Sequence, residues 1–124
     1  MNMKEMTQKT GLSADSIRYY EKEKLIRIPR NISGYRDFTT ANLERLTLIT
    51  KFRAAGCGID FLRKYCALLD DTKNHDSEQR QMLADEAINA KKRLAAMTDA
   101  IDYLDYKVEV YYKNVKKLGD QSKN

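Results

Sequence analysis

Apolar side chains recur at three- and four-residue steps along most of this chain, and polar stretches divide them into helical segments. The first segment carries Met3 and Met6 and ends at Gly11, which can adopt the left-handed conformation that closes a helix. Ser13 then starts a second helix, with its hydroxyl placed to accept the amide of Ser16. A helix, a turn containing glycine and a second helix are typical of a helix-turn-helix.

A small hairpin is predicted next. Pro29 prevents the second helix from continuing, because its ring blocks the helical backbone. Turn-forming residues follow at Asn31, Ser33 and Gly34. Residues 35–38 are then predicted to form the return strand.

Two further helices are predicted before residue 70. Thr39 is placed to cap the third helix, whose apolar positions recur at steps of three. Gly56 and Gly58 interrupt the pattern, and a fourth helix is predicted from residue 59 to 69. Cys66 lies on the apolar face of that helix, so we expect it in the core.

A long helix is predicted after a polar connection, with apolar positions that alternate in steps of four and three. Over five heptads the seam would extend roughly 50 Å. A lone helix cannot bury so narrow a stripe against a small domain, so we expect a partner helix, most simply a second copy. The seam positions are Leu83, Ala87, Ala90, Leu94, Met97, Ile101, Leu104, Val108, Tyr111, Val115 and Leu118.

The seam leaves the orientation of that helix pair open. The β-branched residues Ile101 and Val108 at one heptad position, with Leu104 at the other, favour a parallel dimer. Small residues such as Ala87 at the start and bulky ones such as Tyr111 at the end favour an antiparallel dimer, because small side chains then face large ones.

Composition narrows the function classes. The 124 residues are 42% hydrophobic and 33% charged, enough for one packed domain, and five glycines and one proline favour helices. A net charge of +5 is compatible with a polyanionic partner. No membrane span or signal peptide is apparent, and two cysteines suit a reducing cytosol, so we expect a cytoplasmic protein. There is one histidine and no nucleophile beside a base, so neither an enzyme nor a bound cofactor is predicted.

Two clusters of arginine and tyrosine stand out, SADSIRYY at residues 13–20 and GYRDF at residues 34–38. Tyrosines of this kind can simply be core aromatics. The flanking Arg18 and Arg36 favour DNA contact instead for at least two of Tyr19, Tyr20 and Tyr35, since arginine meets phosphates and base edges. A helix and a hairpin with such clusters form the layout of a winged helix-turn-helix.

The chain resembles the mercury-resistance-regulator (MerR) family of bacterial transcription factors. The resemblance rests on GLSADSIRYYEKEKLI at residues 11–26, SGYRDFT at residues 33–39 and RAAGCGIDFLRKY at residues 53–65. It implies an all-α fold with a small β-hairpin wing, and a homodimer joined by an antiparallel coiled coil. The expected division is a winged helix-turn-helix domain at 1–70, a linker at 71–79, the dimerisation helix at 80–119 and a polar tail at 120–124.

The resemblance also implies a function. Such a dimer binds a pseudopalindrome in a promoter with an overlong spacer, then bends and untwists it so that the elements read by RNA polymerase realign. The protein would then work on the nucleoid of a bacterial cytoplasm. Tyr20 is expected in the core. The expected DNA contacts are Ser13, Ser16, Arg18, Tyr19, Arg30, Ser33, Tyr35 and Arg36.

The residues say less about the chemical signal to which such a regulator would respond. LADE at 83–86 and IDYLDYK at 101–107 resemble the aldehyde- and thiol-stress branch, but Lys51 stands where that branch carries a cysteine. Cys57, six residues later, is the candidate redox sensor, with a small buried hydrophobe as the alternative. The metal-sensing branch carries cysteines at the dimer helix that this chain lacks, so no metal site is predicted. A coiled-coil adaptor whose head binds protein is the competing class.

Overall fold

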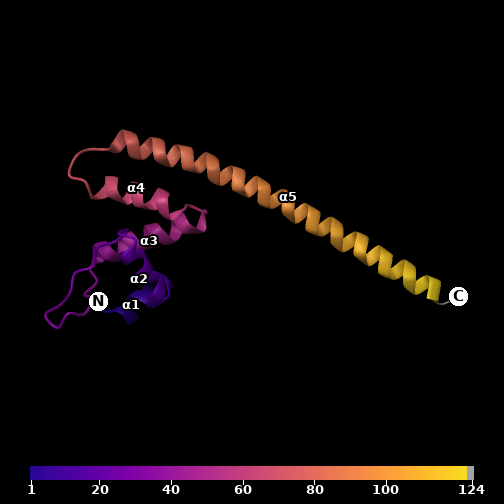
Figure 1. Cartoon of the computed structure of the whole chain (residues 1–124), viewed down its shortest axis with the longest axis horizontal. Helices are drawn as coiled ribbons and strands as arrows, with labels where there is room; N and C mark the ends of the chain where they lie inside the picture. Colours follow the sequence, from indigo (N-terminus) through magenta and orange to yellow (C-terminus); the bar gives the residue numbers. More distant parts are fainter. Residues whose placement is uncertain (123–124) are drawn as a thin grey trace. The chain divides into compact units, whose positions relative to one another are not determined.

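The computed structural model describes the backbone of residues 1–122 and the side chains of residues 1–115. Its regular elements are five helices, shown in order in Figure 1. The chain divides into two compact units, residues 1–87 and residues 88–124. The helices are α1 (Met3–Thr10), α2 (Ala14–Lys22), α3 (Thr40–Ala54), α4 (Ile59–Asp70) and α5 (Asp76–Ser122).

The capping residues predicted for the first three helices are confirmed. Gly11 ends α1 with φ 74°, and its amide donates to the carbonyl of Thr7. The hydroxyl of Ser13 accepts the amide of Ser16 at 3.1 Å at the start of α2. Thr39 caps α3 by accepting the amide of Asn42 at 3.1 Å. The bonds to Ser13 and Thr39 satisfy amides that would otherwise lack a partner at the starts of α2 and α3, and the Gly11 bond satisfies a carbonyl at the end of α1.

One hydrophobic core holds the first four helices together. Its centre is formed by side chains with no exposed surface from α1, α2, α3, α4 and the segment after α2. Tyr20 is 7% exposed and Cys66 is 1% exposed, so the prediction that both are buried is confirmed. The fully buried apolar side chains at this centre are Met6, Ile17, Leu25, Leu46, Ile49 and Leu62.

Aromatic packing and one ion pair fix α3 against α4. Phe52 of α3 and Tyr65 of α4 have ring centroids 5.3 Å apart. Arg45 of α3 donates to the carbonyl of Leu25 at 2.8 Å and binds both carboxylate oxygens of Asp70. A two-pronged arginine–carboxylate pair of this kind fixes geometry as well as charge. Arg45 therefore connects α3 and α4 to the segment that follows α2.

The predicted hairpin is smaller than expected. Residues 29–37, which we call the wing loop, contain one isolated antiparallel bridge between Arg30 and Arg36, and the described residues form no strand. Pro29 has no amide to donate, which ends the ladder on one side. On the other side, the side chain of Asn31 takes the amide of Tyr35 at 3.1 Å, so the backbone ladder ends there too.

The long helix starts earlier than the sequence pattern indicates. α5 begins at Asp76, four residues before the predicted residue 80, so that residues 71–75 connect it to α4. The side chain of Asn74 accepts the amide of Asp76 at 2.8 Å, and Asp76 and Glu78 place negative charge in the first turn. Polar residues that look like a linker in sequence therefore serve as the start of the helix.

The predicted seam lies on the surface of the single chain. Its large apolar side chains are 39% exposed at Leu83, 62% at Leu104 and 73% at Tyr111. Leu118, the last seam position, lies outside the residues whose side chains are described. None of the described helices combines the length and hydrophobicity that a membrane span requires.

Candidate nucleic-acid interface

One face of α2 carries the first group of predicted DNA contacts. Ile17 and Tyr20 point into the core, which leaves the polar residues on the opposite side. Ser13, Arg18 and Tyr19 are exposed there, with Tyr19 44% exposed. Ser16 is partly buried, and its hydroxyl accepts from the hydroxyl of Ser13 at 3.0 Å.

Arg18 is held on that face by Asp15. The guanidinium donates to the Asp15 carboxylate at 2.9 Å, and the Asp15 side chain is 95% exposed. An ion pair so open to water contributes little free energy, so the guanidinium can exchange Asp15 for a phosphate or a base edge at small cost.

The wing loop carries the second group. Ser33 and Tyr35 are exposed, Tyr35 at 73%. The turn is closed by Asn31, whose side chain accepts the amides of Ser33 at 3.0 Å and Tyr35 at 3.1 Å. Gly34 has φ 84°, a conformation that a residue with a side chain adopts only with strain. The loop therefore presents its polar side chains from a fixed backbone.

Glu21 connects the two groups, and it was not among the predicted residues. Its Oε1 atom accepts hydrogen bonds from Arg30 Nη2 at 3.1 Å and from Arg36 Nε at 3.0 Å, and Arg36 Nη2 lies 2.9 Å from the same oxygen in an ion pair. Partial burial favours protonation of Glu21, but the hydrogen bonds from Arg30 and then Arg36, with their charges, outweigh it and lower the pKa. The acid was visible in the sequence directly after the two tyrosines, yet no local pattern indicated its partners.

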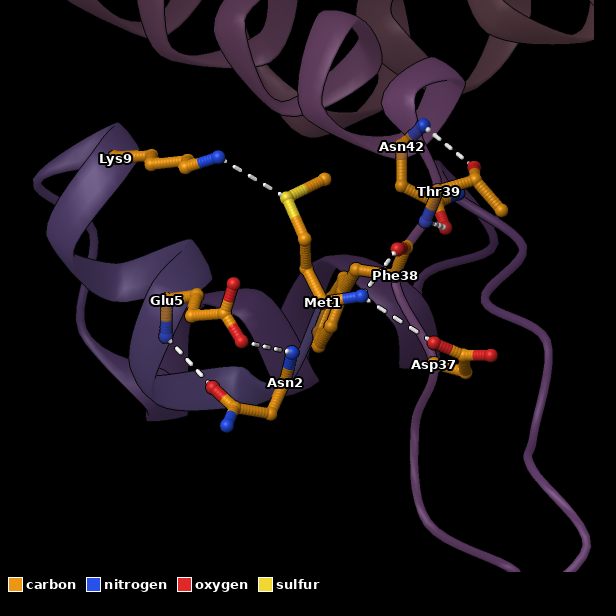
Figure 2. A network of polar contacts seen from close by, with 8 residues as sticks. All are labelled: Met1, Asn2, Glu5, Lys9, Asp37, Phe38, Thr39 and Asn42. Atoms are coloured by element: carbon orange, nitrogen blue, oxygen red, sulfur yellow. Dashed lines mark hydrogen bonds and ion pairs between the residues drawn. The ribbon is translucent and has the colours of Figure 1, made fainter.

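A polar network fixes the end of the wing loop to Met1, just before α1 (Figure 2). The ammonium group of Met1 donates to the carbonyl of Phe38 at 2.9 Å and to the carboxylate of Asp37 at 3.3 Å. The amide of Phe38 in turn donates to the carbonyl of Met1 at 2.8 Å. Figure 2 also shows Asn42, whose side chain accepts the amide of Thr39 at 2.9 Å.

The candidate sensor thiol is enclosed. Cys57 is 4% exposed between α3 and α4, and its carbonyl accepts from Arg53 at 3.1 Å. Burial also raises the pKa of the Cys66 thiol, and the neighbouring Arg45 offsets this only in part. No disulfide joins the two cysteines. The burial of Cys57 agrees with the alternative interpretation, a small hydrophobe in the core.

The acidic connection before α5 forms ion pairs rather than a cluster of metal ligands. His75 lies 2.7 Å from the carboxylate of Asp71 and 3.5 Å from that of Glu78. Across the part of the chain that the structure describes, no three His, Cys, Asp or Glu side chains gather closely enough to hold a metal ion.

Comparison with known proteins decides the family. The family model described as MerR HTH family regulatory protein matches residues 1–69, which contain α2 and the wing loop. The chain belongs to the MerR family. It is therefore a DNA-binding transcription regulator and not an enzyme. The same assignment favours DNA over protein as the partner of residues 1–69, against the hypothesis of a coiled-coil adaptor.

Individual MerR-family relatives cover different shares of the chain. The HTH-type transcriptional regulator CueR of Yersinia pestis is 37% identical over 79 residues, which are 63% of this chain and 57% of that protein. A MerR family transcriptional regulator from Listeria monocytogenes superposes with a TM-score of 0.80 at 35% identity, covering 99% of this chain and 94% of that one.

A second solved structure bears on the DNA interface. HiNmlR, a MerR family regulator lacking the sensor domain, was solved bound to promoter DNA. It superposes with a TM-score of 0.79 at 25% identity, and the match covers 95% of this chain and 94% of that protein. The fold that presents α2 and the wing loop here is thus also the fold of a chain that holds promoter DNA.

Proposed function

We propose that this MerR-family chain binds a pseudopalindromic promoter operator as a homodimer, with α2 of each copy in a major groove. Arg18 then contacts a base edge or a phosphate, Tyr19 contacts a phosphate, and Ser13 and Ser16 meet the DNA backbone. The observation that carries the proposal is the exposure of Ser13, Arg18 and Tyr19 on one face of a helix in a fold shared with a promoter-bound relative.

The wing loop supplies the contacts beside the groove in this proposal. Arg30, Ser33, Tyr35 and Arg36 meet the phosphate backbone, which carries charge but no sequence information. The fixed turn at Asn31 supports this role, because a preformed loop loses little conformational freedom on binding.

The homodimer would form through α5. From Leu83 to Val115 the seam side chains are largely exposed in the single chain, and a second α5 would cover them. We infer an antiparallel coiled coil, which sets the small residues near Ala87 against the bulky ones near Tyr111. A dimer by light scattering that becomes a monomer on Leu104→Asp would support it. A monomeric wild type at micromolar concentration would contradict it.

The regulatory step in this proposal is a change in DNA shape. The bound dimer bends and untwists an overlong spacer, so that RNA polymerase finds both promoter elements on one face. The protein then acts in the bacterial cytoplasm, on the nucleoid. A response to aldehyde or thiol stress would act through Cys57, and because that thiol is buried it would react only after local opening. Run-off transcription with methylglyoxal, on wild type and Cys57→Ser, tests this step.

Selection from a random duplex pool at low salt tests the central claim. The expected result is one enriched pseudopalindrome, protected symmetrically in a footprint over two half-sites. Arg18→Ala should weaken binding to it by about tenfold or more, since a charge-assisted contact contributes roughly 1.5–3 kcal/mol. Lys64→Ala, which removes an exposed cation from α4, is the matched control and should change binding much less. A pool without any enriched sequence would refute DNA recognition.

A further inference from the structure

Glu21 joins α2 to the wing loop through its side chain, and it contacts two cations rather than one. The side chains are 20% exposed at Glu21, 27% at Arg36 and 41% at Arg30. The Glu21–Arg36 pair is therefore partly shielded from water, where an ion pair is stronger and better oriented than on an open surface, while Arg30 remains exposed.

Arg30 and Arg36 each keep N–H donors that Glu21 does not occupy. Arg36 donates its Nε hydrogen to Glu21 and holds Nη2 in an ion pair with it, and Arg30 donates from Nη2. A guanidinium carries five N–H donors, so each arginine retains donors for a phosphate. The two arginines also face each other across the isolated bridge, where their like charges would push them apart without the carboxylate between them.

We propose that Glu21 is a positioning residue for DNA binding, which holds the wing loop at a fixed distance from α2 and aims Arg30 and Arg36 at the phosphate backbone. The inference rests on the proposed function, because it assigns Glu21 a role in that same interface. Glu21 itself does not touch DNA. Its carboxylate stays ionised at neutral pH, and its negative charge opposes the binding of a polyanion when considered alone.

A charge effect and a positioning effect of Glu21 would change the affinity for DNA in opposite directions, so one substitution can distinguish them. If Glu21 acted only through its charge, Glu21→Ala would tighten binding to DNA, because one negative charge is removed beside the phosphates. If Glu21 positions the arginines, the same change weakens binding. We expect about tenfold weaker binding of Glu21→Ala at fixed salt, with Glu21→Gln between it and wild type.

The experiment is a salt titration of binding to the operator duplex selected by the wild type. Loss of one or two aligned phosphate contacts should reduce the slope of log K against log salt by about 1–2. Glu23→Gln is the matched control, since Glu23 follows α2 and pairs with Arg63 rather than with the wing loop. We expect its binding and slope to match wild type within about twofold.

A double-mutant cycle separates positioning from mere folding. In an Arg30→Ala, Arg36→Ala background, the Glu21 substitution should have no further effect on DNA binding, because neither arginine that Glu21 positions is present. Should Glu21→Ala fail to fold, Glu21→Gln, which keeps the size and one acceptor oxygen, completes the cycle.

Three results bear on the outcome. Equal or tighter binding by the Glu21 variants would overturn the proposal, and so would a loss that persists undiminished without the two arginines. A wild type that selects no operator would instead refute DNA recognition itself, so the two failures are distinguishable.

Discussion

Asn42 is a buried polar residue that bonds the chain on both sides of the wing loop. It is 6% exposed on α3, and its side chain makes two hydrogen bonds of 2.9 Å. Its Nδ2 atom donates to the carbonyl of Arg27, before the wing loop, and its Oδ1 atom accepts the amide of Thr39, after it. One side chain thus bonds both ends of the segment.

Replacing Asn42 with alanine leaves a carbonyl and an amide without these partners. A buried group without a partner costs about 1–3 kcal/mol. Because Thr39 is exposed, water can reach its amide and replace part of the lost bond. We therefore expect Asn42→Ala to lower the free energy of unfolding by about 2–3 kcal/mol in total. For a unit of this size that corresponds to a fall in melting temperature of about 10–20 °C.

The assay is urea unfolding followed by hydrogen exchange of peptides from residues 1–70. Far-UV circular dichroism would be dominated by α5, which has 47 residues. Asn42→Asp is the control, because a carboxylate oxygen can still accept the Thr39 amide but cannot donate to Arg27. It should also lose stability, because a buried carboxylate oxygen then faces the Arg27 carbonyl, and comparison with Asn42→Ala thus tests whether the donor to Arg27 is the contact that matters. An unfolding free energy of Asn42→Ala within about 0.5 kcal/mol of wild type would refute the reasoning.

Three further predictions concern other features. Lys24 has φ 63°, so Lys24→Gly should be at least about 1 kcal/mol more stable to urea than Lys24→Val, and equal stabilities would contradict the assigned strain. Leu46→Ala should cost about 3 kcal/mol in the same assay, because the side chain is fully buried in the core, and a loss below about 1 kcal/mol would contradict that packing. The hydrogen bond to Asp71 raises the pKa of His75 above 6.5, so this contact stabilises the start of α5 below that pH and loses its effect as pH rises through the folded pKa. An NMR titration of the single histidine should show the raised pKa, and Asp71→Asn should lower it; an unchanged pKa would contradict the contact.

Local signals in the sequence predicted the helix boundaries where capping decides them. Gly11, Ser13 and Thr39 each act within three or four residues of their own position, so their roles follow from the chain around them. The same holds for Tyr20, whose burial follows from the helical spacing that also places Ile17 in the core. The recognition motifs similarly led to the correct family, because they lie in unbroken segments.

Contacts between distant residues account for what the sequence did not reveal. The partners of Glu21 lie nine and fifteen residues further along the chain, and no periodicity connects them. The hairpin was overestimated because strand propensity says nothing of Asn31, whose side chain replaces the next rung of the ladder. The start of α5 was placed too late because Asn74 and Asp76 are equally common in linkers and at helix starts.

The bonds that hold the wing loop also bear on the speed of operator recognition. Met1, Asn31 and Asn42 fix the loop before any DNA is present, so no folding step need precede or follow the encounter. Association should then be limited by diffusion and by attraction between cations and phosphates, and it should slow as salt is added. The lifetime of the complex, rather than its rate of formation, would then distinguish an operator from the rest of the chromosome.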